Sequence, residues 1–252
     1  MTVDLLELAE NANTYTPLGP EDERDVTPRY VLWMGSRDEP PWNVAQRFRL
    51  AEDEVDDVRA EIHARLRAKG RTACTWEVGT HATPSDLVNQ LLARGLVDDA
   101  TPLAVGMVLT EPPVAPPPDV EVRRATAHDD LLAAARIAAV AFGMPEPVSV
   151  PDQTSDENVV YVALVDGEPV ARAAASFSPH GVTLFGGATL PEARGRGAYR
   201  ALVAARWDEA VRRGVPALVT QASPMSRPIL ARLGFREVCE IRILLDEFGE
   251  AA

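Results

Sequence analysis

The sequence predicts a mixed α/β (α+β) fold, in which helices flank a twisted mixed β-sheet. It also predicts a second, truncated domain of the same kind at the N-terminus. Three observations predict it. Strands and helices follow one another along both halves, a proline-rich segment separates the halves, and a glycine-rich turn joins a strand to a helix in the second half. Since 46% of the 252 residues are hydrophobic, the chain can build one large core or two small ones.

The N-terminal half contains five predicted elements in the order β, α, β, α, β. The first helix, in residues 51–70, is amphipathic: Val55 and Val58 lie on one apolar stripe, and its acids come first and its bases last. The second helix is expected to begin with Thr83 as its cap and Pro84 at its first position. The strands are expected at residues 29–35, 73–79 and 102–110.

A proline-rich segment follows the last of these strands. Residues 110–119 contain five prolines, which remove backbone donors and favour an extended conformation. We interpret residues 111–119 as a linker between a domain of residues 1–110 and a domain of residues 120–252. An edge strand or a packed connector is the alternative interpretation, and it would also mark a boundary.

The C-terminal half alternates more regularly, in the order β, α, β, β, β, α, β, α, β. The first helix is expected to begin with acids in its first turn and to end at Gly143. Asp166-Gly167 predicts a hairpin turn between two of the strands. The expected strands are residues 120–126, 158–165, 169–177, 182–190, 216–223 and 237–245. The expected helices are residues 127–143, 197–214 and 226–234.

The composition of the chain argues against several classes of function. The formal net charge of −13 argues against a nucleic-acid-binding protein, and it suits either a cationic or amine partner or simply solubility. Cys74 and Cys239 stand far apart without a CxxC or a Cys/His cluster, so neither a metal site nor a disulfide framework is expected. Without a signal peptide or a membrane-spanning stretch, the sequence predicts a cytoplasmic protein.

The glycine-rich turn lies in LPEARGRGAYRAL, residues 190–202. A strand, then glycines, then a helix start directs several backbone N–H groups and the positive end of a helix dipole to one point. Glycines let the backbone approach an anion such as a pyrophosphate closely, and Arg194 and Arg196 add positive charge. The turn therefore predicts an anion-binding site, although an ordinary tight turn can have the same letters.

Residues 120 to about 248 resemble the GNAT superfamily of N-acetyltransferases, which bind acetyl-CoA and typically transfer its acetyl group to an amine. The family's pyrophosphate motif is Arg/Gln-x-x-Gly-x-Gly/Ala. Arg194 and Gly197 fit it, whereas Tyr199 stands where glycine or alanine is usual. The segment GFREV, residues 234–238, after a short helix matches the family's closing segment.

The resemblance implies a set of acetyl-CoA-binding residues. The turn would hold the pyrophosphate through backbone amides, and the strand before it would hold the acetyl group and the pantetheine arm. An N–H near Ala188 would polarise the thioester carbonyl. The implied cofactor-binding residues are Ala188, Thr189, Leu190, Arg194, Gly195, Arg196, Gly197, Ala198, Tyr199 and Ser223.

Two polar positions common in the family are occupied differently here. The tyrosine that protonates the departing thiolate in many members is Leu230 in this chain, and the frequent asparagine is Ser223. Ser226 and Tyr199 are the candidate catalytic residues in their place. The alternative is that these side chains cap, pack or position CoA. No base stands out: Glu77 and Glu157 are candidates, but surface carboxylates are the favoured interpretation of both.

The N-terminal half resembles the trailing part of the same fold without the glycine turn, as in tandem members of the family, and it is not expected to hold CoA. The first hypothesis is therefore a cytoplasmic acetyl-CoA-dependent N-acetyltransferase that acts on an amine of a small molecule or peptide. The second is a non-catalytic acyl-CoA-binding regulatory module. Neither a nucleic acid nor a membrane is an expected partner, and the sequence predicts neither the acceptor nor the oligomeric state.

Overall fold

The structure is a computed structural model that describes residues 4–147, 150 and 155–249. The chain forms two compact units. The C-terminal unit comprises Val108–Thr220, Ile229–Arg236 and residues up to Leu5, and the N-terminal unit comprises Leu6–Met107, Gln221–Pro228 and Glu237–Ala252. The last strand of the chain thus groups with the N-terminal unit, so the units interleave along the sequence. The simple division at residues 111–119 stays a prediction.

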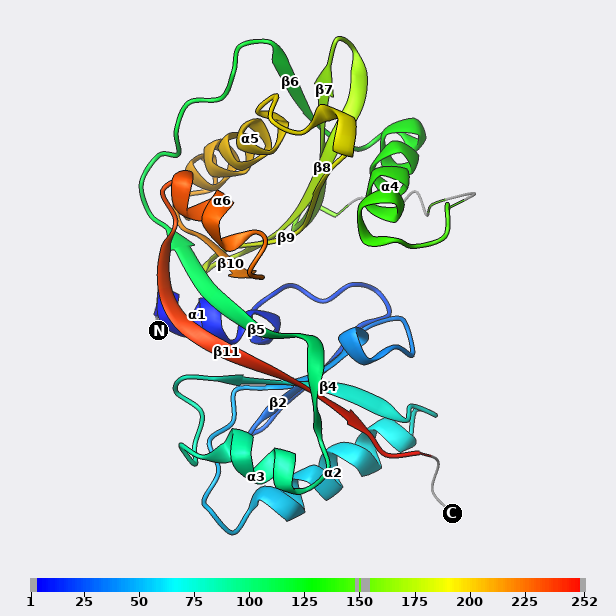
Figure 1. The fold of residues 1–252 in the computed structure, drawn as a ribbon, viewed down its shortest axis with the longest axis vertical. Coiled ribbons are helices and arrows are strands. Elements are labelled where there is room, and N and C mark those ends of the chain that lie inside the picture. The colour runs from blue at the N-terminus through cyan, green and yellow to red at the C-terminus, as the bar shows by residue number, and fades with distance from the viewer. Residues whose placement is uncertain (1–3, 148–149, 151–154, 250–252) are drawn as a thin grey trace. The chain divides into compact units, whose positions relative to one another are not determined.

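The C-terminal unit is built on the strand order β10-β9-β8-β7-β6. Strands β9 and β10 are parallel, and the pairs β9–β8, β8–β7 and β7–β6 are antiparallel. Helices α4 and α5 lie on opposite sides of these strands (Figure 1). The elements are β6 (Val120–Arg124), α4 (His128–Phe142), β7 (Asn158–Val165), β8 (Glu168–Ser178), β9 (Gly181–Thr189), α5 (Ala198–Arg212), β10 (Leu218–Ala222) and α6 (Arg227–Arg232).

The predicted elements from residue 120 onward are all present, and their ends differ from the prediction by no more than two residues. Alternation explains this agreement. In β7, Val160, Val162 and Leu164 pack against α4, while Tyr161 and Ala163 point to the other face of the sheet. The mixed α/β fold class predicted from the sequence is confirmed.

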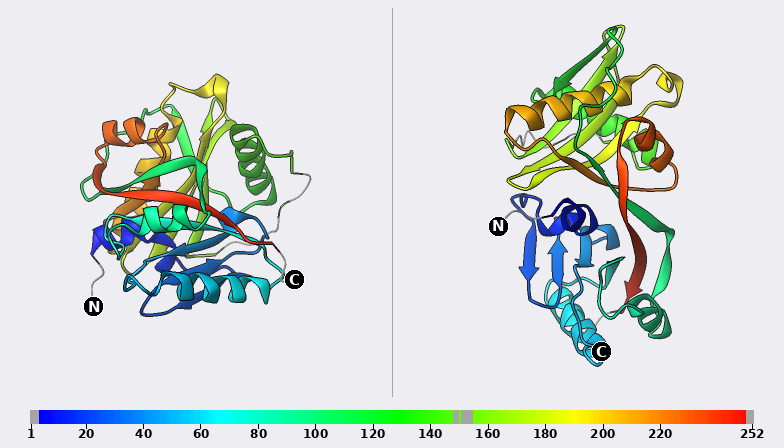
Figure 2. Two further views of the ribbon diagram at one scale, coloured as in Figure 1. Left: turned by 60° about the horizontal axis from the view of Figure 1, so that its bottom comes forward. Right: turned by 90° about the vertical axis from the view of Figure 1, so that its left-hand side faces the viewer.

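The N-terminal unit has the strand order β1-β2-β3-β4-β11-β5. Strands β3 and β4 are parallel, with α2 between them in the sequence, and β4 pairs antiparallel with β11. Helices α2 and α3 cover one face of these strands and α1 lies against the other (Figures 1 and 2). The elements are α1 (Leu5–Glu10), β1 (Glu23–Val26), β2 (Val31–Met34), β3 (Asn43–Gln46), α2 (Val55–Arg67), β4 (Ala73–Gly79), α3 (Leu87–Ala93), β5 (Val97–Leu109) and β11 (Arg236–Glu247).

Several elements of this unit differ from the prediction. Strand β3 was not predicted because its buried ends are polar: Asn43 donates to Ala73 O at 3.1 Å and Gln46 donates to Asn11 O at 3.1 Å, so no apolar alternation marks the strand. Helix α3 begins at Leu87 rather than at Pro84. The backbone of Thr83 is hydrogen-bonded to Phe48 and Leu50 instead of capping a helix.

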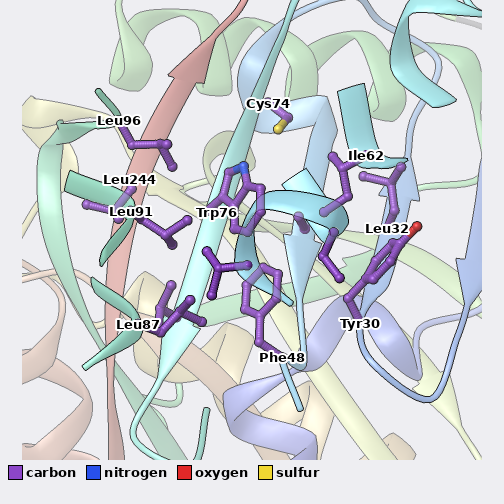
Figure 3. Packing of buried hydrophobic residues seen from close by; sticks show 14 of the residues in the cluster. Tyr30, Leu32, Phe48, Ile62, Cys74, Trp76, Leu87, Leu91, Leu96 and Leu244 are labelled. Atoms are coloured by element: carbon purple, nitrogen blue, oxygen red, sulfur yellow. The ribbon is translucent and has the colours of Figure 1, made fainter. Parts of the chain in front are cut away.

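The core of the N-terminal unit lies between its sheet and the two helices α2 and α3. Figure 3 shows Trp76 of β4 at its centre, with the ring of Phe48 stacked on it at a centroid distance of 4.8 Å. Leu87 and Leu91 of α3 pack on one side of this pair, and Ile62 of α2 lies on the other. Large aromatic side chains of this kind contribute much of the burial energy of a small core.

No helix within the described ranges is long and apolar enough to cross a membrane. Cys74 and Cys239 are both buried free thiols, and burial raises the pKa of Cys239 to about 12. A cytoplasmic location stays a prediction.

Candidate functional site

The strand before the glycine turn is interrupted by a bulge. Strand β9 pairs with β8 through Arg172↔Ala188 and Ala174↔Phe185, so Gly186 and Gly187 form an irregularity between these pairs. Gly186 has a φ of 57°, a left-handed conformation that glycine adopts without strain. Bulges bend a strand and interrupt its ladder, and they are common beside active sites.

Two side chains lie across this bulge and explain its glycines. Nη1 of Arg172 donates to Gly186 O at 2.5 Å, and a Cβ on Gly186 would collide with that nitrogen. A Cβ on Gly187 would lie 2.6 Å from the ring of Tyr199, which is closer than real contacts allow. The two glycines are therefore required because Arg172 and Tyr199 cover the strand.

A buried arginine stands behind these residues. Arg206 of α5 is only 1% exposed. Its Nε donates to Leu202 O at 2.9 Å and its Nη1 to Ala174 O at 3.2 Å, while Nη2 has no hydrogen-bond partner among the described residues. Its guanidinium carbon lies 5.9 Å from the centroid of the Tyr199 ring. Burial, together with the charge of Arg206, lowers the pKa of Arg172 to about 10, so Arg172 remains cationic at neutral pH. Burial also lowers the pKa of Arg206.

The glycine turn follows directly. Leu190 precedes a short 3₁₀ helix, Pro191–Ala193, and then the chain passes through Gly195 (φ 80°) and Gly197 (φ 84°) into α5. Within the described residues, five N–H groups of this stretch donate to no protein acceptor; they belong to Gly195, Gly197, Ala198, Tyr199 and Arg200. Such a group of unpaired donors at the positive end of a helix dipole can bind an anion.

The charges around the turn are mostly positive. Arg194 is exposed and makes no ion pair with any residue that the structure describes, whereas Arg196 pairs with Asp166 at 2.7 Å. The first turn of α5 contains no acid. Arg200 is part-buried, and its Nη2 lies 3.4 Å from the position of a Cβ on Gly197.

The proline-rich segment touches the turn. A Cβ on Gly197 would collide with Cγ of Pro117 and lie 2.9 Å from its Cδ. Glycine is therefore required at position 197 for two reasons: the backbone there is left-handed, and the ring of Pro117 leaves no room for a Cβ. The ring of Pro117 therefore packs against the glycine turn.

The candidate acetyl-CoA residues divide into two groups. Ala188 is buried on β9, Thr189 and Leu190 are part-buried at its end, and Tyr199 lies over the neighbouring bulge, so the structure brings these residues together with the turn. Ser223 groups with the N-terminal unit instead.

The two serines form a local turn. The Ser223 and Ser226 hydroxyls lie 3.3 Å apart, and the backbone of Ser223 accepts hydrogen bonds from Ser226 N at 3.1 Å and Arg227 N at 2.9 Å. These contacts precede α6, in which Leu230 is buried and only 2% exposed. Both hydroxyls thus take part in starting a helix.

Sequence reasoning missed several residues. Arg172 lies in a segment that predicts a strand, and Arg206 lies in one that predicts a helix. In the sequence, only the adjacent glycines of GGATL, residues 186–190, indicate that side chains cross the strand there. The interpretation of Glu77 as a surface carboxylate is wrong: it is only 9% exposed, because β4 is covered on both faces. Glu157 is exposed, as expected.

Comparisons with known proteins agree with this geometry. Residues 130–235, which contain the bulge, the turn and α5, match the family model described as Acetyltransferase (GNAT) family. The C-terminal half of the chain belongs to the GNAT acetyltransferase family. The family model does not extend into the N-terminal half. Among curated proteins, none matches the chain significantly.

Solved structures with the same fold cover nearly the whole chain. A GCN5-related N-acetyltransferase from Kribbella flavida is 20% identical, with a TM-score of 0.76 over 99% of this chain and 97% of its own. A GCN5-related N-acetyltransferase from Sphaerobacter thermophilus is 16% identical, with a TM-score of 0.63 over 90% of this chain and 83% of its own.

A tandem GNAT protein from the clavulanic acid biosynthesis pathway is 14% identical, with a TM-score of 0.60 over 98% of this chain and 94% of its own. The predicted tandem arrangement thus agrees with a tandem GNAT structure over the whole chain. At these identities the likeness concerns the fold.

Proposed function

We propose that this protein is an acetyl-CoA-dependent N-acetyltransferase that transfers an acetyl group directly to an amine of a small molecule or peptide. The observation that carries the proposal is the unpaired N–H groups at the start of α5, placed directly after the bulged strand β9. Acetyl-CoA supplies the acetyl group as an activated thioester. Charged pyrophosphate oxygens fit these donors, and the cationic Arg194 lies beside them.

The residues have separate roles in this proposal. Backbone amides of Gly195, Gly197 and Ala198 bind the pyrophosphate, with charge from Arg194 and Arg196. Ala188, Thr189 and Leu190 hold the pantetheine arm and the acetyl group, and an N–H near Ala188 stabilises the negative charge that develops on the carbonyl oxygen. The bulge supports this role because it frees backbone groups of β9 from regular pairing.

The departing thiolate needs a proton. Tyr199 is the first candidate donor, because its ring packs over Gly187 next to Ala188. Ser226 is the second, although its hydroxyl is shared with Ser223. A thiol is a tolerable leaving group, with a pKa of about 8.5, and general acid catalysis typically contributes only about 10²–10⁴-fold.

A second function, a non-catalytic acyl-CoA-binding regulatory module, is favoured by one observation: the position usual for the catalytic tyrosine holds Leu230, whose side chain is buried. The glycine turn serves this function equally well. The bulged donor strand favours the enzyme, since binding alone does not require groups directed at the thioester.

Two measurements on the wild-type protein separate these functions. Calorimetric titration with acetyl-CoA tests binding, and release of free thiol in the presence of an amine panel tests transfer. Binding with amine-dependent thiol release is the expected result. Binding without release under any amine would favour the regulatory module, and no binding at all would contradict both functions.

A further inference from the structure

A cavity lies between helix α5 and the edge of the sheet within the C-terminal unit. Its volume is about 360 Å³, in the lower part of the range of roughly 300–1,000 Å³ that is typical of small-molecule sites. It is lined by Val122 and Arg124 of β6, Tyr161 of β7, and Ala205, Glu209 and Arg212 of α5. All of these residues belong to the same unit, and none is part of the glycine turn.

Strand register and helical spacing bring these side chains together. Arg124 is paired with Tyr161 across the antiparallel strands β6 and β7, so both side chains lie on one face of the sheet. This face is opposite to the one that packs against α4. Positions 205, 209 and 212 are four and three residues apart, so they share one side of α5. Helix α5 lies against this face of β6 and β7 and forms the wall of the cavity (Figure 1).

The phenol of Tyr161 is buried but has no hydrogen-bond partner. The residue is only 6% exposed, and its hydroxyl forms no hydrogen bond with any residue that the structure describes. The hydroxyl is not among the atoms that are sealed from solvent, so it opens to the cavity that Tyr161 lines. Burial raises the pKa of Tyr161, so the phenol keeps its proton at neutral pH and can donate it. Buried tyrosine hydroxyls usually have a partner, and a ligand in the cavity would supply one.

The phenol lies among positive charges. Four arginines oppose the rise in its pKa, in descending order Arg213, Arg124, Arg206 and Arg212. Two of them, Arg124 and Arg212, line the cavity itself. The chain as a whole has a net charge of −13, so the charge around this cavity is opposite in sign to that of the whole protein. Arginines gathered in a cleft attract small anions.

Glu209 neutralises only part of this charge. Its Oε1 accepts a hydrogen bond from Arg213 Nε at 2.5 Å, and its Oε2 pairs with Arg212. Since both carboxylate oxygens are engaged and the side chain is only 13% exposed, Glu209 is not available to the ammonium group of a ligand. The lining holds two arginines and one carboxylate, which leaves an excess of one positive charge.

Arg124 has donors that no residue uses. Its Nη2 donates to Ser155 O at 2.6 Å and to Asp156 Oδ1 at 3.1 Å. Its Nε and Nη1 donate to no acceptor among the residues that the structure describes, and neither is sealed from solvent. A planar guanidinium edge together with the hydroxyl of Tyr161 is a donor set that suits a carboxylate.

We propose that this cavity binds a small carboxylate with a short hydrocarbon chain, at a site separate from the glycine turn. Arg124 and Tyr161 donate to the carboxylate, and Arg212 adds charge at the rim. Val122 and Ala205 contact the hydrocarbon chain. A monoanion matches the single excess charge of the lining, whereas a phosphate dianion exceeds it. The site does not depend on the proposed acetyl transfer.

The first test observes the phenol in the full chain. Carbon NMR of protein labelled at tyrosine Cζ gives signals for four tyrosines, and Tyr161→Phe assigns one of them. n-Hexanoate should shift this signal until it saturates, and hexan-1-ol, which has the same chain without the charge, should not. The absence of a saturable shift would overturn the proposal.

Calorimetry with n-hexanoate tests the donors. Arg124→Gln and Tyr161→Phe should each weaken binding about tenfold or more, because each removes a hydrogen bond to a charged group. Arg136→Gln, in an exposed arginine of α4 on the opposite side of the sheet, is the control and should leave binding unchanged. An equal loss in all three variants would overturn the proposal.

A blocking variant tests the place of binding. Ala205→Met fills the cavity without changing a charge and should weaken hexanoate binding at least about tenfold; unchanged binding would overturn the proposal. Loss of binding in Arg194→Ala but not in Arg124→Gln would place hexanoate at the glycine turn and would also overturn it. Inorganic phosphate should bind more weakly than hexanoate, and tighter binding of phosphate would overturn the choice of a carboxylate. Hexanoate binding by a protein that does not bind acetyl-CoA would support this site and contradict only the proposed function.

Discussion

Each unit contains a junction at which a strand leads into a helix, and the two junctions contain different kinds of residue. Between β9 and α5 stand Gly195 and Gly197 in left-handed conformations, followed by a helix without acids in its first turn. Between β3 and α2, the chain instead buries Phe48, which is 0% exposed, and α2 begins with acids at positions 56 and 57. The first junction exposes its backbone around Gly195, and the second supplies core side chains.

This difference shows how few residues decide between binding and packing. Both helices have an N-terminal end with unpaired donors and a positive dipole. In α5 the neighbouring charges are arginines, which reinforce attraction for an anion, whereas in α2 Asp56 and Asp57 oppose it. The aromatic stack of Phe48 on Trp76 also fills the space beneath the N-terminal junction (Figure 3).

The largest effect is expected where the N-terminal junction serves as core. Phe48→Ala removes a fully buried ring stacked on Trp76, and such truncations cost about 3–5 kcal/mol of unfolding free energy. Denaturant unfolding measures this loss. The affinity for acetyl-CoA at temperatures where the variant remains folded should not change; a parallel loss of affinity would show that the two junctions are coupled.

The next effect concerns pH and the buried carboxylate of β4. Because the pKa of Glu77 is raised from 4.5 to about 7, the folded state binds more protons than the unfolded state between these values. Its contribution to stability is therefore fully present below pH 4.5 and is lost as the pH rises through about 7, on the order of 3 kcal/mol in all.

Unfolding free energies of the wild type and Glu77→Gln, measured across this range, test the sign. The difference between the two proteins should shift steadily in favour of Glu77→Gln as the pH rises and level off above the pKa of Glu77. A difference independent of pH would mean that Glu77 titrates as an ordinary exposed carboxyl.

The same contrast explains what could be predicted from the sequence. The elements after residue 120 are predictable because alternation, helix stops and the glycine turn are local signals, and the turn carries the family motif. Strand β3 was hidden because Asn43 and Gln46 satisfy distant carbonyls, which no local pattern reveals. Glu77 is buried because α1 covers the second face of β4, and this packing between distant segments cannot be predicted from the local sequence.

The site was predictable only in its backbone part. Arg194 and Gly197 follow from spacing, but the crossing of Arg172 and Tyr199 over the bulge depends on strand pairing between β8 and β9. Likewise, the contact of Pro117 with Gly197 joins segments about eighty residues apart in the sequence, and composition indicated only that the proline-rich segment is extended.

A smaller effect is expected at the glycines that bound α5. Gly197 and Gly214 both have positive φ, 84° and 73°, but a Cβ at Gly197 meets Pro117 and one at Gly214 meets nothing within 4 Å. Gly214→Ala should cost about 1 kcal/mol of unfolding free energy and leave acetyl-CoA binding unchanged. Gly197→Ala should cost about 1–3 kcal/mol and weaken acetyl-CoA binding, as calorimetry can measure. Equal behaviour of the two variants would contradict a role for the turn and its contact with Pro117.

The smallest effect concerns the charges that distinguish the two junctions. Arg194 is exposed and forms no ion pair within the described residues, so its charge remains available to an anion, whereas Arg196 is paired with Asp166. Arg194→Ala should weaken acetyl-CoA binding about two- to fivefold at low salt, and less in high salt because counterions screen an exposed charge. Arg37→Ala, an exposed arginine of the N-terminal half, is the matched control and should have no effect. A salt-independent loss at Arg194 would mean that this side chain acts through packing rather than charge, which would remove one of the two electrostatic differences between the junctions.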